Sequence, residues 1–264
     1  MDKNRLLEMA DNPELIPGIY NYCDRWCERC DFTSRCLQFQ MEQEEEDLAS
    51  TSSTTEELNA EFWEKVTNAF SMAIELIKDI AEREGIDLDH DDTEEEMAER
   101  RKNHEKACSH PCSQAALAYS DMVDAWFEST KESWEEKDAE LLPEAQPSLP
   151  HMNPVREAYD MRDAAEVIRW YQYFIYPKVA RALEGKLQGV SRTQEGMPRD
   201  SDGSAKVAMI AIDHSIGAWG KLHREFPDKK DETLRILVHL ERLRRSMEGV
   251  FPNARAFIRP GFDE

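Results

Sequence analysis

Four cysteines near the N-terminus form the densest group of reactive side chains in the sequence. They are Cys23, Cys27, Cys30 and Cys36, which lie in the spacing C-x3-C-x2-C-x5-C. Thiolates at this density repel one another unless a cation neutralises them, and a metal ion both neutralises them and lowers thiol pKa values. If residues 20–30 are helical, the first three sulfurs share one face and the fourth can fold back from the next turn. The spacing therefore predicts a metal centre.

The cysteine spacing leaves the identity of the metal open. Structural zinc usually takes its ligands as two separated pairs, whereas iron–sulfur clusters accept several ligands from one short segment. The aromatic neighbours Tyr22, Trp26 and Phe32 can supply a water-poor shell around a cluster. We therefore expect an iron–sulfur cluster with a redox or redox-sensing role. The alternative is structural zinc in a non-enzymatic interaction protein whose acidic surface binds a basic protein partner. A third reading is that the thiols pack as small apolar groups without metal.

The same residues carry two resemblances. The triad Cys23, Cys27 and Cys30 resembles the cluster motif of radical S-adenosylmethionine enzymes, but that family implies alternating strands and helices, whereas this chain predicts helices throughout. The stretch NYCDRWCERCDFTSRC, followed by a helical chain, resembles a group of bacterial all-α proteins with an N-terminal cysteine cluster. That resemblance implies an all-α fold and brings no activity.

A second group of potential ligands surrounds Pro111. It consists of His104, Cys108, His110 and Cys112. The same residues fit a helix-to-helix corner, in which Ser109 or His110 caps the following helix and Pro111 opens it. We expect the corner, and the sequence leaves open whether any of the four residues joins a metal site.

Other kinds of active site find no support in the sequence. None of the seven histidines completes the Glu-x-x-His pair of a di-iron helical bundle. The chain also lacks a phosphate-binding loop, a dinucleotide fingerprint and a nucleophile elbow. The sequence therefore assigns no catalytic residue.

The charge and hydropathy of the chain exclude several partners. A formal net charge of −22 and a pI of about 4.7 argue against binding to nucleic acid or to an anionic membrane surface. The longest apolar run, residues 207–212, is far shorter than the ~20 residues that span a bilayer. We expect a cytoplasmic protein, and in that reducing compartment cysteines serve as thiols or metal ligands rather than disulfides.

Amphipathic helices must hold the cysteines in place. Apolar residues recur at helical spacing, with expected helices at 58–84, 111–143, 161–182, 204–226 and 231–250. The polar stretch 92–108 is either a short solvated helix or a connector. No stretch shows the alternation of a strand. We predict an all-α antiparallel bundle of four to five main helices at 57–264, an acidic and Ser/Thr-rich linker at 41–56, and a cysteine-rich metal-binding segment at 1–40.

Overall fold

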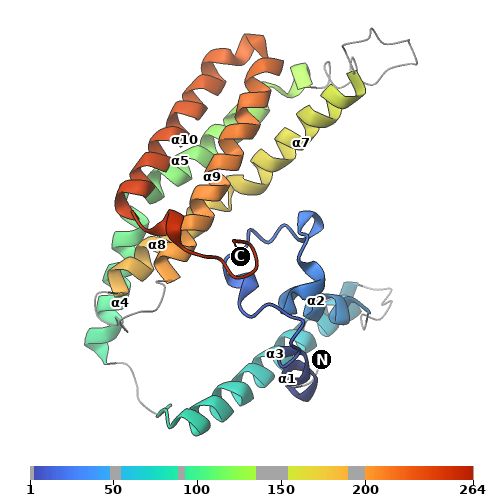
Figure 1. Ribbon diagram of the computed structural model, residues 1–264, viewed down its shortest axis with the longest axis vertical. Helices are drawn as coiled ribbons and strands as arrows, with labels where there is room; N and C mark the ends of the chain where they lie inside the picture. The colour runs from blue at the N-terminus through green and yellow to red at the C-terminus, as the bar shows by residue number, and fades with distance from the viewer. Residues whose placement is uncertain (1–2, 48–54, 89–92, 135–153, 190–199, 264) are drawn as a thin grey trace. The chain divides into compact units, whose positions relative to one another are not determined.

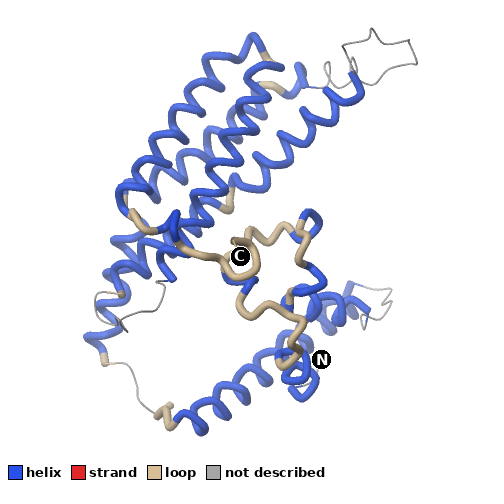
Figure 2. Tube along the Cα trace, in the orientation of Figure 1, coloured by secondary structure: helices blue, strands red, loops and turns tan. Residues whose placement is uncertain are grey.

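The computed structural model describes residues 3–47, 55–88, 93–134, 154–189 and 200–263 (Figure 1). This part of the chain contains helices and loops without strands, which confirms the predicted all-α class (Figure 2). The chain divides into two compact units. One comprises Met1–Ala98 together with Arg259–Glu264, and the other comprises Glu99–Ile258.

The C-terminal unit is a helical bundle built around α9 (Asp200–Glu225). Its neighbours are α7 (Pro154–Gln172), α8 (Ile175–Gln188) and α10 (Lys230–Val250), which all pack against α9 (Figure 1). The sequence predicts a central position for this helix, because its apolar residues occupy two faces. Burial of Val207 and Met209 on different faces confirms that prediction. The helix α5 (Pro111–Ser129) completes the bundle by packing on α7, α8 and α10.

The expected helix 161–182 is in fact two helices, which corrects the sequence prediction. α7 ends at Gln172 and α8 begins at Ile175. Pro177 explains the break, since it has no N–H to donate to the carbonyl of Tyr173 and its ring would clash with that carbonyl. The expected helix 111–143 also ends earlier, at Ser129, and residues 135–143 lie outside the described part of the chain.

The N-terminal unit also differs from the predicted organisation. Residues 41–47 belong to a helix, α2 (Leu37–Asp47), rather than to a linker, while 48–54 lie outside the described residues. Glutamate and glutamine are good helix formers, so a polar stretch need not be a loop. Arg5 of α1 (Lys3–Ala10) donates from Nε to Glu44 Oε1 over 3.1 Å and so joins α1 to α2.

The helix α3 (Thr55–Glu84) lies in the N-terminal unit rather than in the bundle. Its end is as predicted, because Gly85 adopts a positive φ of 67°. The apolar face that suggested a core helix remains largely exposed, at Phe62, Trp63, Phe70, Ile74, Ile77 and Ile80. The amphipathic pattern therefore predicted the helix correctly, but not what it packs against.

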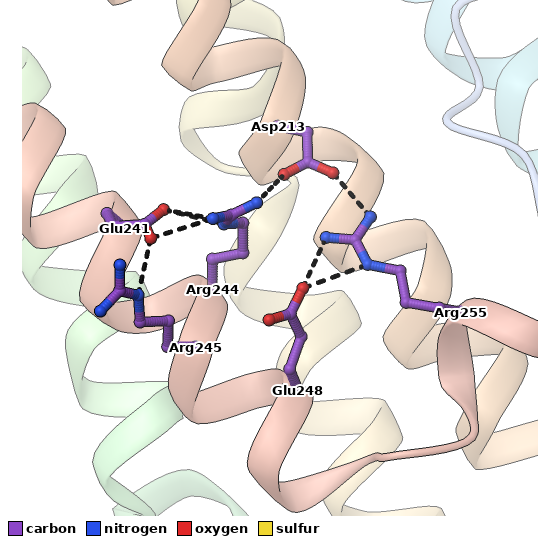
Figure 3. Close-up of polar contacts among 6 residues, drawn as sticks. All are labelled: Asp213, Glu241, Arg244, Arg245, Glu248 and Arg255. Atoms are coloured by element: carbon purple, nitrogen blue, oxygen red, sulfur yellow. Dashed lines mark hydrogen bonds and ion pairs between the residues drawn. The ribbon is translucent and has the colours of Figure 1, made fainter.

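Ion pairs fasten the end of the C-terminal unit to α9 and α10 (Figure 3). Arg255 donates to Asp213 Oδ2 over 2.6 Å and to Glu248 Oε1 over 3.0 Å. Arg244 in turn lies 3.8 Å from Asp213 and 2.7 Å from Glu241. Asp213 and Glu248 both raise the pKa of Arg255, so the guanidinium remains charged within this network.

Candidate metal centre

The cysteine segment is a series of short turns rather than a helix. It contains three 3-10 turns, η1 (Ile19–Asn21), η2 (Cys27–Arg29) and η3 (Thr33–Arg35). Asp24 Oδ1 accepts a hydrogen bond from the Trp26 N–H over 3.1 Å, and Arg25 between them has a φ of 60°. Both features are incompatible with continuous helix. The expected stacking of three sulfurs on one helical face is therefore wrong.

The turns nevertheless bring together the four cysteines that the sequence predicts as ligands. Cys23, Cys27, Cys30 and Cys36 are all half-buried, and all four line a single cavity of about 20 Å³. The rest of its wall is mostly apolar and aromatic, from Ile19, Tyr20, Trp26, Phe32, Thr33, Phe39 and Phe262, and it also includes Asp24 and Arg25. The sequence identified the cysteines together with Trp26 and Phe32, whereas Tyr20, Phe39 and Phe262 were missed.

The thiols do not form a ligand set as they stand. Among the residues that the structure describes, no three His, Cys, Asp or Glu side chains are grouped so that they could hold a metal ion. The Cys23 thiol donates instead to the carbonyl of Tyr20 over 3.5 Å. Cys30 Sγ accepts a hydrogen bond from the N–H of Phe32 over 3.4 Å.

The surroundings of Cys27 oppose its ionisation. Burial raises the pKa of this thiol, and the negative charges of Glu42 and of the other three cysteines raise it further. Four thiolates cannot share this cavity without a counter-charge. A cation at the centre would reverse the effect, since metal coordination deprotonates thiols.

Residues from the opposite end of the chain close one side of the cavity. Phe262 lines it and meets Phe32 edge to face, with 5.0 Å between ring centroids. The turn that presents Phe262 is held by an ion pair, in which Arg259 lies 3.0 Å from Asp263. The backbone N–H of Arg259 also donates to Asp263 Oδ2 over 2.8 Å.

Gly261 explains how this tail approaches so closely. Its φ of 76° is in the left-handed region, and a Cβ at this position would lie 2.7 Å from Ile16 Cδ1 and 3.0 Å from Ile19 Cδ1. Only glycine meets both requirements without strain. A glycine after a proline signals a turn in the sequence, but it does not tell which surface the turn contacts.

The second group of potential ligands forms the predicted corner. His110 is the N-cap of α5, where its Nδ1 accepts a hydrogen bond from the Cys112 N–H over 3.1 Å, and Pro111 is the first helical residue. Cys112 is buried in the bundle. His104 and Cys108 lie on α4 (Glu94–Ser109), with 3.5 Å between Nε2 and Sγ. The structure thus confirms the corner and places His104 beside Cys108.

Comparisons with protein-family models, with curated proteins and with solved structures gave no match. In the described part of the chain, no helix is long and apolar enough to cross a membrane.

Proposed function

We propose that Cys23, Cys27, Cys30 and Cys36 bind one metal ion and that this ion stabilises the N-terminal unit. The observation that carries the proposal is that all four thiols line the same cavity of about 20 Å³. A cavity of this size holds about one water-sized sphere, and hence one small ion. The aromatic wall keeps water away from the thiolates, which strengthens their attraction to a cation.

The size of the cavity favours zinc over a cluster. At a zinc–sulfur distance of about 2.3 Å, four tetrahedral sulfurs are about 3.8 Å apart, with room for one ion only. An iron–sulfur cluster adds several iron and sulfide atoms between the same ligands and needs a larger space. The thiols must draw together to reach a zinc ion, and the short turns that carry them can shift more easily than a helix.

The small core of the N-terminal unit gives the metal a structural purpose. In the part of this unit whose side chains are described, the buried apolar residues are Met9, Leu15, Ile19, Trp26 and Ala81. A core of this size contributes little to the free energy of folding, and domains with so small a core commonly depend on a metal. Zinc binding supplies folding free energy directly, because the unfolded chain has no preformed site.

Metal analysis of the full chain, purified without chelators, tests the proposal. We expect about one zinc ion per chain, and we expect the substitution Cys27→Ser to remove most of it, because three thiolates leave an open coordination position. The substitution Cys108→Ser is the matched control and should leave the metal content unchanged. A protein that binds no metal, or a Cys27→Ser protein that retains it, would contradict the proposal.

The same metal analysis distinguishes a zinc ion from the iron–sulfur cluster expected from the sequence. Stoichiometric iron and sulfide, with visible absorbance after anaerobic purification, would replace zinc by a cluster and support a redox or redox-sensing role. If zinc is found, the alternative from the sequence applies, in which the net charge of −22 favours a basic protein partner. A cytoplasmic location suits either metal, because a reducing compartment keeps the thiols free to bind it.

A further inference from the structure

A cysteine outside the metal centre lies beside a histidine and a glutamate. Cys108 Sγ is 3.5 Å from His104 Nε2, one turn earlier on α4. On its other side, His104 Nδ1 is 3.5 Å from Glu184 Oε2, which belongs to α8. The three side chains thus form a continuous series of thiol, imidazole and carboxylate, all within the C-terminal unit.

The carboxylate determines which nitrogen of His104 can act as a base. A proton on Nδ1 is donated to Glu184, which leaves the lone pair of Nε2 facing the thiol of Cys108. This is the general arrangement of an activated nucleophile, in which a third group orients the base. From α8, Tyr176 also faces the thiol, and its hydrogen bond with Cys108 raises the pKa of Tyr176, so that the hydroxyl remains a donor to the sulfur.

We propose that Cys108 is a thiol-modification site that reacts with small disulfides, with His104 as the base and Glu184 as the residue that positions His104. The Cys108 thiol gives its proton to His104 Nε2, and the sulfur attacks one sulfur of the small disulfide. A new S–S bond forms to Cys108 while the original S–S bond breaks. The departing thiolate takes the proton from His104, so that one protein thiol and one disulfide become one mixed disulfide and one free thiol.

The exposure of the three groups favours a small, freely diffusing reagent. The side chain of His104 is 63% exposed and that of Glu184 is 32% exposed, while Cys108 is half-buried. A small disulfide can reach such a thiol in line, without a binding cleft. Cys112, four residues further on, is 2% exposed and serves as an internal reference for an inaccessible thiol. The proposal does not depend on the metal centre, because none of these residues lines that cavity.

The test uses oxidised glutathione and the full chain, with mass spectrometry of the digested protein to follow each cysteine separately. An ordinary thiol is about 3% ionised at pH 7, so a neighbouring base can accelerate its reaction by up to about 30-fold. We expect Cys108 to react about tenfold faster in the native chain than in the chain unfolded in guanidinium chloride, because only the folded helix holds His104 Nε2 beside the thiol, where it can take the proton. An equal or slower native rate would overturn the proposal.

Substitutions separate the base from the residue that positions it. His104→Ala should slow the reaction of Cys108 about tenfold, and imidazole added to the buffer should restore part of the rate, which a merely structural defect would not allow. Glu184→Gln should slow the reaction in the native background but have no further effect in the His104→Ala background, since it acts through His104. Glu105→Gln, an equal change of charge on the exposed face of α4, is the matched control and should leave the rate unchanged.

Each result of these substitutions bears on the proposal. A His104→Ala protein that reacts at the native rate would overturn the role of His104. If Glu184→Gln slows the reaction of Cys108 equally with and without His104, the positioning role of Glu184 would be overturned. Circular dichroism of each variant confirms that α4 and α8 are retained, and the comparison of native with unfolded wild-type chain remains decisive if a variant fails to fold.

Discussion

The six cysteines of this chain show how strongly one residue type depends on its surroundings. The pKa of Cys27 is raised by burial together with nearby negative groups, whereas the pKa of Cys112 is raised by burial alone. A cation can offset the negative groups around Cys27, but nothing offsets the burial of Cys112 while the bundle stays folded. Cys27 is therefore suited to bind a metal and Cys112 to remain an inert thiol in the core.

His110 gives the corner between α4 and α5 a dependence on pH. Its Nδ1 caps α5 only when the imidazole is neutral, and burial and the charge of Lys186 lower the pKa of His110 below its usual 6.5. As the pH falls below about 6.5, the unfolded chain therefore takes up this proton before the folded chain does. The stabilisation from this histidine is complete above that pH and is lost as the pH falls through the lower folded pKa.

We predict that His110→Asn makes the stability of the protein less sensitive to acid. Asparagine is a good N-cap and does not titrate, so a stabilisation of about 1 kcal/mol should persist at pH 5. Thermal unfolding followed by circular dichroism at pH 7, 6 and 5 measures the effect. The melting temperature of the wild type should fall more steeply than that of the variant. Parallel curves would show that the cap of α5 does not respond to protonation of this residue.

At the scale of elements, the C-terminal tail connects the two ends of the chain through Gly261. We predict that Gly261→Ala weakens tail docking by about 1–2 kcal/mol, because alanine disfavours a φ of 76° and its Cβ displaces Ile16 and Ile19. Loosening of Phe262 should then open the cavity. A chelator should then remove the metal ion that we propose for this cavity more rapidly, which stopped-flow measurement with a coloured chelator can detect.

Gly217→Ala is the matched control for this substitution. Gly217 lies within α9, and a Cβ added there would have no heavy atom within 4 Å. Alanine in a helix is more favourable than glycine by about 1 kcal/mol, so the control should stabilise the bundle and leave metal release unchanged. Equal release rates in the two variants would mean that the tail does not close the metal cavity.

The ion pairs of Figure 3 lead to a second prediction, on how α9 is held to α10 and to Arg255. Asp213 on α9 contacts both Arg244 and Arg255, so Asp213→Asn removes a shared partner. These side chains are 33–40% exposed, and water screens them. We therefore expect a loss of about 1 kcal/mol at low salt, falling as the ionic strength rises. Denaturant unfolding at two salt concentrations measures it, and a loss independent of salt would point to packing instead of charge.

At the scale of the whole molecule, the two compact units differ in how much core they possess. Among the described residues, most of the largest fully buried side chains, including Trp219, Tyr119 and Tyr171, belong to the C-terminal unit. Their polar atoms also have partners, since Trp219 Nε1 donates to the Tyr119 hydroxyl over 3.1 Å. This unit therefore contains the interactions that a domain needs in order to fold alone.

We predict that a fragment of residues 94–258 unfolds cooperatively on heating. A fragment of residues 54–264 keeps the exposed apolar face of α3 and the tail but lacks the cysteine segment, so Phe262 loses its contact with Phe32. It should bind more of a hydrophobic dye than the shorter fragment does. Calorimetry and dye fluorescence of the two fragments provide the test. A molten 94–258 fragment would show that the bundle depends on the N-terminal unit.

Local patterns in the sequence were sufficient to predict the all-α class and several of the helices, and to single out four cysteines. Helical periodicity located α9 and α10 to within a few residues, because an amphipathic stripe depends only on neighbours along the chain. The four cysteines could be recognised because their spacing alone brings them into one short segment. The helix start at Pro111 was predicted on the same local grounds, with Ser109 or His110 as its cap, and the structure has His110.

Only the tertiary structure decided how these parts come together. The turn at Asp24 replaced the helix expected for the cysteines, because a single side-chain hydrogen bond competes with helix and hydrophobic periodicity does not report it. Phe262 at the cavity, Glu184 beside His104 and the membership of α3 in the N-terminal unit all depend on residues far apart in the sequence. Such contacts form where surfaces fit in three dimensions, and the local pattern of one chain does not encode which surfaces will meet.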